Sequence, residues 1–289
     1  MVFGSSELIL NADKSIYHLN LLPEDIADTI ITVGDPDRVE QVSSYFDTIE
    51  LKKGKREFIT HTGKLRGKRI TVISTGIGTD NIDIVLNELD ALANIDFSSR
   101  TVKKEIKRLD LVRIGTSGAI QTDIAVDSFL LSEYAIGFDS LLSSYRSESV
   151  RETAFEKALV DQISGLQRKS TPYVVRCDDD LASTFTSNRI RLGINITASG
   201  FYGPQSRRLR LEPEDPNQME KIIRFKHEGR RLTNLEMETS GIYGLSKLLG
   251  HRAVSLNAIL ANRATGEFSK NPEKTVEDLI KFTLKKLTP

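Results

Sequence analysis

Short runs of β-branched residues alternate with helical patterns along almost the whole chain, and this alternation constrains the fold more than any other feature. It is typical of an α/β protein whose helices surround a largely internal sheet. The runs that we expect to form strands are Ile30–Val33, Arg69–Ser74, Leu111–Ile114, Ser128–Glu133, Tyr173–Arg176, Ile190–Thr197 and Val254–Leu260.

The expected helices carry apolar residues every three or four positions, which is the spacing of a core-facing stripe. One stripe runs from Ile82 to Leu92, a second from Phe155 to Leu166 and a third from Val276 to Leu287. Asn271-Pro272 has the residue types of an N-cap and a first helical turn, so the third helix should begin there. A fourth helical stretch covers Ser240 to Leu249.

The chain is expected to form a single domain over residues 1–289, because no segment has the composition of a linker. A short N-terminal extension covers about residues 1–16. The charged segment 96–108 is interpreted as a surface excursion with a helical turn of its own. A second charged segment, 212–231, fits either a mobile flap or a solvated helix.

Charge and cysteine content exclude several classes of function. Lys plus Arg and Asp plus Glu both total 40, so no net field attracts nucleic acid or an anionic membrane, and any anion site must be local. The single cysteine, Cys177, excludes an intramolecular disulfide framework and the usual multi-cysteine zinc sites. Without a signal peptide or a membrane-length apolar run, a cytoplasmic protein is expected.

Three glycine-rich segments are candidate anion sites. Gly34-Asp35-Pro36-Asp37-Arg38 follows a strand and opens a helical pattern, so N–H groups, a helix N-terminus and a guanidinium could meet one anion. Ser74–Gly78 repeats the arrangement, and Arg113–Gly118 does so again with Arg113 inside the strand. The first segment alone also fits a capped turn with a surface arginine. A strand arginine is costly unless its site contains a carboxylate or a bound anion.

The segment Phe201–Arg207 places a neutral amide, Gln205, two residues before the guanidinium of Arg207. Such a pair can read a pyrimidine edge, since the amide accepts from N3–H and donates to one carbonyl while the guanidinium donates to a carbonyl. The alternative is an ordinary Gly-Pro turn followed by a solvated basic run up to Arg210.

Glu236-Met237-Glu238 precedes the helical stretch at Ser240. A carboxylate there can accept from vicinal sugar hydroxyls while methionine packs on the sugar face. Taken alone, acidic residues at a helix start also fit a simple complement to the helix dipole. The sequence shows no Ser/His/Asp or Cys/His nucleophile pattern, and its four scattered histidines predict no metal site.

The motifs GDPDR, REF, STGIG, RIGTSGAI, FYGPQSR, NLEMET and NAILANR occur in this order from about Tyr17 to the C-terminal helix. Together they resemble the nucleoside phosphorylase family, and Gln205 with Arg207 resembles its uridine-specific group. The resemblance implies a mixed central sheet, partly closed into a barrel and flanked by helices, in homodimers or larger assemblies of dimers. It also implies reversible phosphorolysis of uridine and related pyrimidine nucleosides to uracil and ribose 1-phosphate, with inorganic phosphate as co-substrate and no cofactor.

The resemblance also implies a set of site residues. Arg113, Glu238, Arg263, Gln205 and Arg207 would carry catalysis. Phosphate would be bound by Gly34, Arg38, Arg113 and Thr116, together with Arg56 of a neighbouring subunit. Ribose would be bound by Glu236, Met237 and Glu238, together with His18 of that neighbour. The base would be bound by Phe201, Gln205 and Arg207. Some relatives hold a monovalent cation at the dimer interface, near positions matching Glu57 and Ser74.

Other readings stay open at this point: a purine nucleoside phosphorylase, a nucleosidase of the same fold, or a non-catalytic nucleoside-binding relative. Purine-specific relatives commonly place an aspartate near the position of Asn262, and this chain has none there. A nucleosidase would use water and would not need several phosphate-binding arginines. The complete set of candidate residues argues against the non-catalytic reading.

Overall fold

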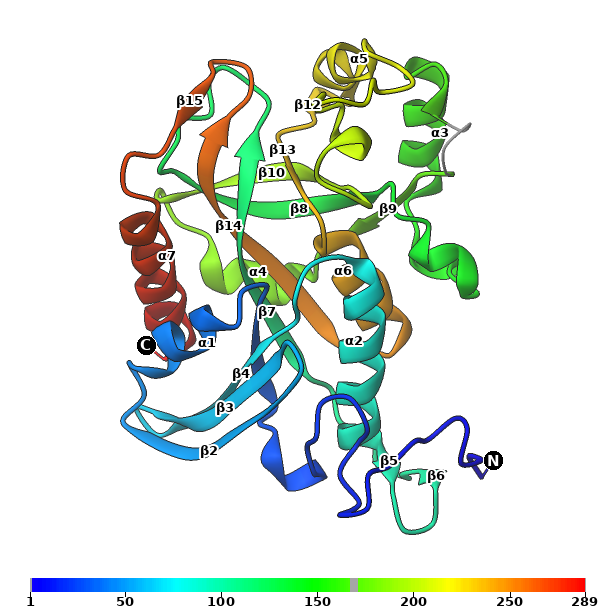
Figure 1. Ribbon diagram of the computed structural model, residues 1–289, viewed down its shortest axis with the longest axis vertical. Coiled ribbons are helices and arrows are strands. Elements are labelled where there is room, and N and C mark those ends of the chain that lie inside the picture. The colour runs from blue at the N-terminus through cyan, green and yellow to red at the C-terminus, as the bar shows by residue number, and fades with distance from the viewer. Residues whose placement is uncertain (1, 167–170, 289) are drawn as a thin grey trace.

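The computed structural model of the protein describes residues 2–166 and 171–288, and most of its strands form one mixed sheet with helices around it (Figure 1). The strands of this sheet are β1 Thr29–Val33, β2 Thr48–Lys55, β3 Phe58–Leu65, β4 Lys68–Ser74, β7 Asp110–Ala119, β8 Phe129–Gly137, β9 Tyr173–Arg176, β10 Ile190–Thr197, β13 Asn234–Glu236, β14 Arg252–Asn262 and β15 Glu267–Phe268. The helices are α1 Asp37–Ser43, α2 Thr79–Asn94, α3 Thr153–Gln162, α4 Asp179–Phe185, α5 Gln218–Arg224, α6 Thr239–Leu248 and α7 Pro272–Leu287.

Five strands of the sheet close into a barrel. Strand β7 pairs with β14, β14 with β8, β8 with β10, β10 with β13, and β13 returns to β7. Register shifts at Gly193/Ile194 and Ile259/Ala261 mark irregularities of the kind that bend strands around such a ring. The predicted fold, a mixed sheet partly closed into a barrel and flanked by helices, is confirmed.

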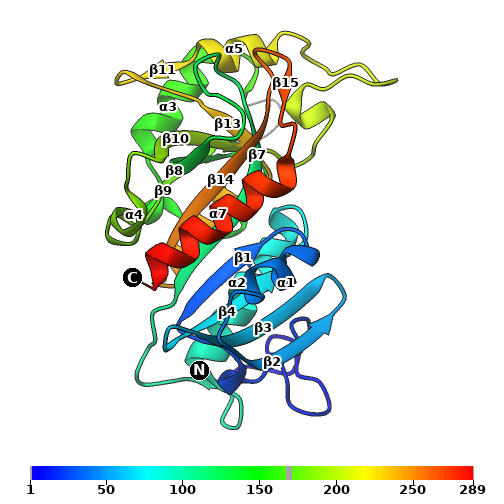
Figure 2. The ribbon, with the colours of Figure 1, turned by 90° about the vertical axis from the view of Figure 1, so that its left-hand side faces the viewer.

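The sheet continues beyond the barrel as a wing formed by β1, β4, β3 and β2 (Figure 2). Strands β7, β1 and β4 run parallel, so the carboxyl ends of β1 and β4 lie at one edge together. Helix α7 packs along β14 and β7, and α2 packs against α6. The Asn271 side chain accepts a hydrogen bond from the Lys274 N–H at 3.2 Å, which confirms the predicted N-cap of α7.

All the expected strands and helices form, although the helix expected as far as Leu166 ends at Gln162. Strands β2, β3, β13 and β15 and helix α4 were not predicted. Strand β2 lies at the sheet edge and its sequence, TIELKKGK, is rich in lysine, a composition that protects exposed edges but hides the strand pattern. Strand β13 has only three residues, too few for a period of two to be visible.

Two local expectations were wrong. Segment 96–108 contains no helical turn; it lies in and after the hairpin of β5 (Ile95–Asp96) and β6 (Thr101–Val102), to which the N-terminal segment is bound. The Arg100 guanidinium donates to the backbone oxygens of Phe3, Gly4 and Leu8, so one charged residue of this segment ties the hairpin to the N-terminal segment. The glycines after Arg113 do not end a strand, because β7 continues through them.

The second charged segment, 212–231, forms helix α5 and the hairpin of β11 (Lys226–His227) and β12 (Arg230–Arg231). Its apolar residues Ile222 and Phe225 are buried in a cluster with Phe155. Among the described helices, none combines the length and apolar character needed to cross a bilayer. Cys177 is free and buried.

Candidate active site

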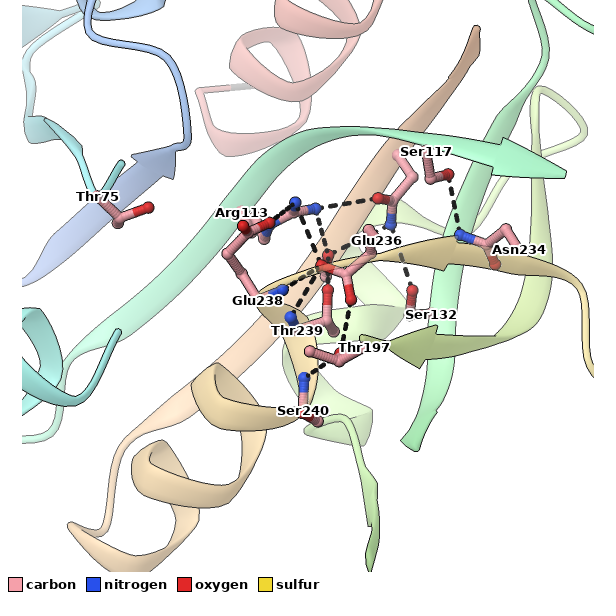
Figure 3. A network of polar contacts seen from close by, with 12 residues as sticks. Thr75, Arg113, Ser117, Ser132, Thr197, Asn234, Glu236, Glu238, Thr239 and Ser240 are labelled. Carbon is pink, nitrogen blue, oxygen red and sulfur yellow. Dashed lines mark hydrogen bonds and ion pairs between the residues drawn. The ribbon is translucent and has the colours of Figure 1, made fainter. Parts of the chain in front are cut away.

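A buried ion cluster lies at one end of the barrel (Figure 3). The Arg113 guanidinium extends from β7, and its Nη2 lies 2.6 Å from Glu238 Oε2 and 3.2 Å from Glu236 Oε2. All three side chains are at least 93% buried, with exposed fractions of 5%, 7% and 2%. The carboxylates that a strand arginine requires are therefore supplied by the Glu-Met-Glu motif, with Met237 half-buried between them.

The remaining terminal N–H groups of Arg113 are also engaged. Its Nη1 donates to Asn257 Oδ1 at 3.0 Å and to Ser255 Oγ at 3.4 Å, both on β14. A Cβ on Gly115 would lie 1.8 Å from Nη1, so this glycine makes room for the guanidinium. Ser255 and Asn257 were not predicted, although their spacing of two within an apolar strand is a signal that could have found them.

Glu236 holds the start of α6. Its Oε2 accepts the backbone N–H groups of Glu238 and Thr239, each at 2.9 Å, and its Oε1 accepts from the Thr197 hydroxyl at 2.6 Å. The carboxylate thus satisfies free donors at a helix N-terminus. Its position beside Arg113 makes it a supporting residue of the cluster as well.

Glu238 connects the cluster to the glycine loop between β4 and α2, since its Oε1 accepts the Gly78 N–H at 2.8 Å. Burial raises the pKa of the Glu238 carboxyl, while the charge of Arg113 opposes this rise. Burial also disfavours the charge of Arg113, but the two carboxylates outweigh it and raise the arginine pKa. The cluster therefore contains one cation and two carboxylates that compete for it.

The two glycine loops meet beside this cluster. A Cβ on Gly34 would lie 3.5 Å from the Gly76 carbonyl oxygen. Arg38 Nη1 donates to the Ile114 carbonyl at 3.4 Å; burial lowers the arginine pKa, the Asp35 charge opposes this, and Arg113 lowers it further. No carboxylate of the described chain forms an ion pair with Arg38, so its charge is available to an anion.

The segment Phe201–Arg207 forms a compact turn around a buried amide. Gln205 ends a short 3-10 helix and is 2% exposed. Arg207 Nη1 donates to Gln205 Oε1 and, at 2.8 Å, to the Phe201 carbonyl, and its guanidinium lies 3.9 Å from the centre of the Phe201 ring. Arg263 Nη1 reaches the same turn and donates to the Gln205 carbonyl at 2.6 Å.

Arg207 and Arg263 are cations without an acidic partner in the part of the chain that the structure describes. Burial lowers the pKa of both, and the Arg263 charge lowers that of Arg207 further. Two unneutralised guanidinium groups beside an amide suit a ligand edge with several carbonyl oxygens, on which negative charge can develop. Because Gln205 is buried, the segment is not the solvated basic turn that the sequence left as an alternative.

The side-chain amide of Asn262 is fully hydrogen-bonded to backbone groups. Its Nδ2 donates to the carbonyls of Gln121 at 2.9 Å and Ile124 at 2.7 Å, and its Oδ1 accepts from the N–H groups of Ala264 and Thr265. The side chain is therefore a loop anchor, and no carboxylate stands at this position.

Three predicted site residues make no hydrogen bond or ion pair with either the ion cluster or the turn around Gln205. His18 Nδ1 lies 2.6 Å from Glu88 on α2, nine residues or about 14 Å along the axis from the helix start beside Gly78. Arg56 is exposed on the β2–β3 turn with φ of 56°, and Thr116 is partly exposed on β7.

The residues suggested for a cation are adjacent, because Ser74 Oγ donates to the Glu57 carbonyl at 2.5 Å. Within residues 2–166 and 171–288, no group of three or more His, Cys, Asp and Glu side chains is arranged to hold a metal ion.

The closed barrel flanked by helices is the fold of the nucleoside phosphorylases. The sequence model of the phosphorylase superfamily matches residues 28–287, and the chain belongs to that superfamily. A uridine phosphorylase from Thermococcus kodakarensis is 30% identical over 94% of this chain and 86% of that protein. A DeoD-type purine nucleoside phosphorylase from Shewanella loihica is 26% identical over 92% and 96%.

The crystal structure of a Trypanosoma brucei nucleoside phosphorylase, described as showing uridine phosphorylase activity, has a TM-score of 0.88 and 28% identity over 97% of this chain and 99% of that one. A study of two Phytophthora capsici uridine phosphorylases includes a structure with the same fold, at a TM-score of 0.70 and 20% identity over 100% and 99%. The prediction that the chain is an enzyme of the pentosyltransferase class is confirmed.

Proposed function

We propose that the enzyme catalyses reversible phosphorolysis of uridine and related pyrimidine nucleosides, giving uracil and ribose 1-phosphate. The observation that carries this proposal is the turn in which buried Gln205 meets Arg207 and Arg263. Uracil presents two carbonyl oxygens that flank an N3–H, so it matches one amide and nearby guanidinium donors. Phe201, which is 51% exposed next to this turn, offers a ring face for the base.

The ion cluster supports an exchange of partners when substrates bind. Since all four terminal N–H groups of Arg113 have protein acceptors, phosphate must replace one of them, and Glu238 is the acceptor nearest the glycine loops. Phosphate between Arg38 and Arg113 would free Glu238 to accept hydrogen bonds from the ribose hydroxyls, with Met237 beside the sugar. The proposed phosphate site includes Gly34 and Thr116.

Bond cleavage leaves positive charge on the ribose and negative charge on the departing uracil. Phosphate held by the arginines stabilises the oxocarbenium-like sugar and then attacks C1′, and binding both reactants together removes the entropy cost of their encounter. Arg207, Arg263 and Gln205 bond the base carbonyls as charge moves onto them. The proposed reaction uses inorganic phosphate and no cofactor.

One experiment tests the reaction. Uridine is incubated with and without inorganic phosphate, base release is followed by ultraviolet absorbance, and the sugar product is identified. We expect phosphate-dependent release and ribose 1-phosphate, with inosine and cytidine turned over about four orders of magnitude more slowly, because they leave buried polar groups unpaired. Free ribose as the main product, or equal turnover of inosine and uridine, would contradict the proposal.

The DeoD-type relatives support the alternative that the enzyme is a purine nucleoside phosphorylase. The residue at position 262, an asparagine, argues against that alternative. Its amide is consumed by four backbone groups, and it carries no proton that could be transferred to a purine N7. The inosine assay above separates the two readings directly.

We also propose a cytoplasmic homodimer that acts in pyrimidine salvage, with a site completed by Arg56 and His18 of a second copy. The support is that both residues lie apart from the ion cluster of their own chain, while Arg56 is exposed and without a partner among the described residues. Arg56→Ala and Gln205→Ala proteins should each be nearly inactive. Mixed and reassociated, they should regain activity, because one pocket of the hetero-dimer is intact. No recovery despite verified subunit exchange would show that each chain holds a complete site.

A further inference from the structure

The interior of the barrel is polar over much of its length. Every barrel strand turns small or polar side chains inward, and all of them are buried. Figure 3 shows several of them, including Ser117, Ser132 and Thr197. They are Arg113 and Ser117 from β7, Ser132 from β8, Asn195 and Thr197 from β10, Asn234 and Glu236 from β13, and Ser255 and Asn257 from β14. A core filled this way needs internal hydrogen-bond partners for every group.

An apolar layer closes this interior on the side away from the ion cluster. Ala119 follows Ser117 by two residues and Ile259 follows Asn257 by two, so they lie on the same inward faces. Both belong to a small cluster with Leu130 and Ile124 and are at most 2% exposed. The polar layer is therefore bounded by the apolar cluster at one end and by Arg113 at the other. We name it the barrel chamber.

Asn195 is the residue of the barrel chamber whose side-chain amide lacks hydrogen-bond partners among the described residues. It is 0% exposed, and neither atom of its amide has a hydrogen-bond partner within the described chain. Its neighbours Ile194 and Ile196 pack outside the barrel with Phe155, so the Asn195 side chain points inward. Thr197 lies on the same face, and its hydroxyl donates to Glu236.

Leaving both amide atoms of Asn195 unpaired would cost about 1–3 kcal/mol for each atom. Native proteins avoid this cost with bound water wherever a buried site is polar and roomy enough. Small side chains stand nearby, at Ala135 on β8 and Ser117 on β7. Asn234, the neighbour of Asn195 on β13, donates one of its two amide N–H groups to Ser117 at 2.9 Å.

We propose that the barrel chamber binds ordered water held by Asn195, and that Asn195 is through this water a positioning residue for Arg113. The route from the chamber to Arg113 is already hydrogen-bonded. Asn257 Nδ2 donates to Ser132 Oγ at 3.3 Å, and Asn257 Oδ1 accepts from Arg113 Nη1 at 3.0 Å. A water molecule between Asn195 and Ser132 would extend this chain of hydrogen bonds from the Arg113 guanidinium to Asn195. The positioning role rests on the proposed function, whereas the water site does not.

The water site is tested by the stability order of two variants, measured by denaturant unfolding. Asn195→Ala leaves space in which water can replace the amide, whereas Asn195→Leu displaces water and strips partners from the neighbouring polar groups. A hydrated chamber makes the Leu variant the less stable of the two. A dry chamber reverses the order, since leucine fills the space that alanine would leave as a cavity.

A high-resolution crystal structure of the unchanged protein gives a second readout that holds even if the Leu variant does not fold. We expect density for water within hydrogen-bond distance of the Asn195 amide. No such density, or a Leu variant more stable than the Ala variant, overturns the water site.

The positioning role is tested with phosphate kinetics. Asn195→Ala should raise the phosphate KM about fivefold, the equivalent of one net hydrogen bond, with a smaller change in kcat. Ser246→Ala is the matched control, because Ser246 on α6 also has a buried, unpartnered hydroxyl but lies outside the barrel. An unchanged phosphate KM in Asn195→Ala, or an equal rise in both variants, overturns the positioning role. If the enzyme does not act on uridine and phosphate at all, the density and the stability order still decide the water site.

Discussion

The two halves of the candidate site differ in whether their charged groups are paired within the protein. The half around Arg113, Glu236 and Glu238 grows from barrel strands and the start of a helix, and its charges are paired inside the protein. The half around Gln205 lies on loops, and its cations, Arg207 and Arg263, have no acidic partner among the described residues. The first half is part of what holds the fold together, and the second is arranged to be completed by a ligand.

Except for buried Gln205, the residues of the loop half are more exposed than the charged residues of the barrel half. Glu238 as a whole residue is 5% exposed, whereas Phe201 is 51% exposed, although both are proposed to contact one nucleoside. Buried charges that pair with each other make substitution costly for the fold, because removing one partner leaves the other in a low-dielectric environment. Changes in the barrel half should therefore reduce stability and activity together, and changes in the loop half should reduce activity on uridine with little effect on stability.

The largest expected effect comes from Arg113→Ala. The variant leaves Glu236 and Glu238 buried without a cation, which should lower the free energy of unfolding by about 3–5 kcal/mol and the melting temperature by about 10 °C. Phosphorolysis should fall to background. Calorimetry and the phosphate-dependent assay measure the two effects.

Arg38→Ala is the control for this prediction. Arg38 serves the same proposed anion, but among the described residues its guanidinium donates only to the Ile114 carbonyl and forms no ion pair. Its loss should therefore weaken phosphate binding while stability changes by about 1 kcal/mol or less. Equal stability losses in the two variants would remove the basis for treating the Arg113 cluster as a structural unit.

A smaller effect, confined to activity, is expected from Gln205→Glu. The carboxylate keeps the shape of the amide and can pair with Arg207, so the melting temperature should stay the same or rise. Uridine turnover should fall by about two to three orders of magnitude, because the amide donor is lost and a charge faces a base carbonyl. Steady-state kinetics with uridine, beside a thermal melt, measure both. A variant that loses stability and activity in parallel would mean that the loop half is as structural as the barrel half.

The same division explains what the sequence could predict of the fold. Strands such as β1 and β4 are buried on both faces and read as continuous apolar runs, so their positions were visible. Strand β2 lies at the edge of the wing, where it pairs with β3. Its lysines obscure the alternation of apolar and polar residues by which a strand is recognised in a sequence. Closure of the barrel depends on pairings such as β13 with β7, which join residues far apart in the chain, and it was expected only from the family resemblance.

In the site, local motifs were predictable and their supporting residues were not. The Glu-Met-Glu and Gly-Pro-Gln motifs carry their chemistry within a few positions. Asn257 is recognisable only once β14 lies beside β7, where its amide accepts from Arg113. Gly115 looked like a turn residue, although its real constraint is the guanidinium folded over it. Such roles arise from long-range packing, and no local pattern marks them.

The pH dependence of activity should also separate the two halves. Because burial raises the pKa of Glu238 above its ordinary value of 4.5, its carboxylate takes up a proton at a higher pH than an exposed glutamate. A protonated Glu238 accepts fewer hydrogen bonds from ribose, so kcat/KM should decline on the acid side at a pH above the usual glutamate range.

Glu238→Gln should remove this part of the acid limb, at a cost of about tenfold in kcat/KM. Any limb that comes from phosphate ionisation remains in both proteins, so the difference between their profiles isolates Glu238. Superimposable profiles would show that Glu238 does not titrate in the catalytic range.

The smallest effect is expected from Phe201→Leu. The ring is half-exposed, contacts the Arg207 guanidinium at 3.9 Å, and contributes no buried polar group, so its loss should leave the melting temperature unchanged. Leucine keeps much of the apolar area but not the flat face, and the uridine KM should rise about three- to tenfold, as for an aromatic contact of about 0.5–1.5 kcal/mol. The phosphate KM should not move, because Arg38 and Arg113 belong to the other half. Uridine and phosphate are therefore titrated separately at saturating levels of the other substrate. A parallel rise in both KM values would show that Phe201 organises the whole pocket, and the contrast between a structural barrel half and a ligand-completed loop half would not hold.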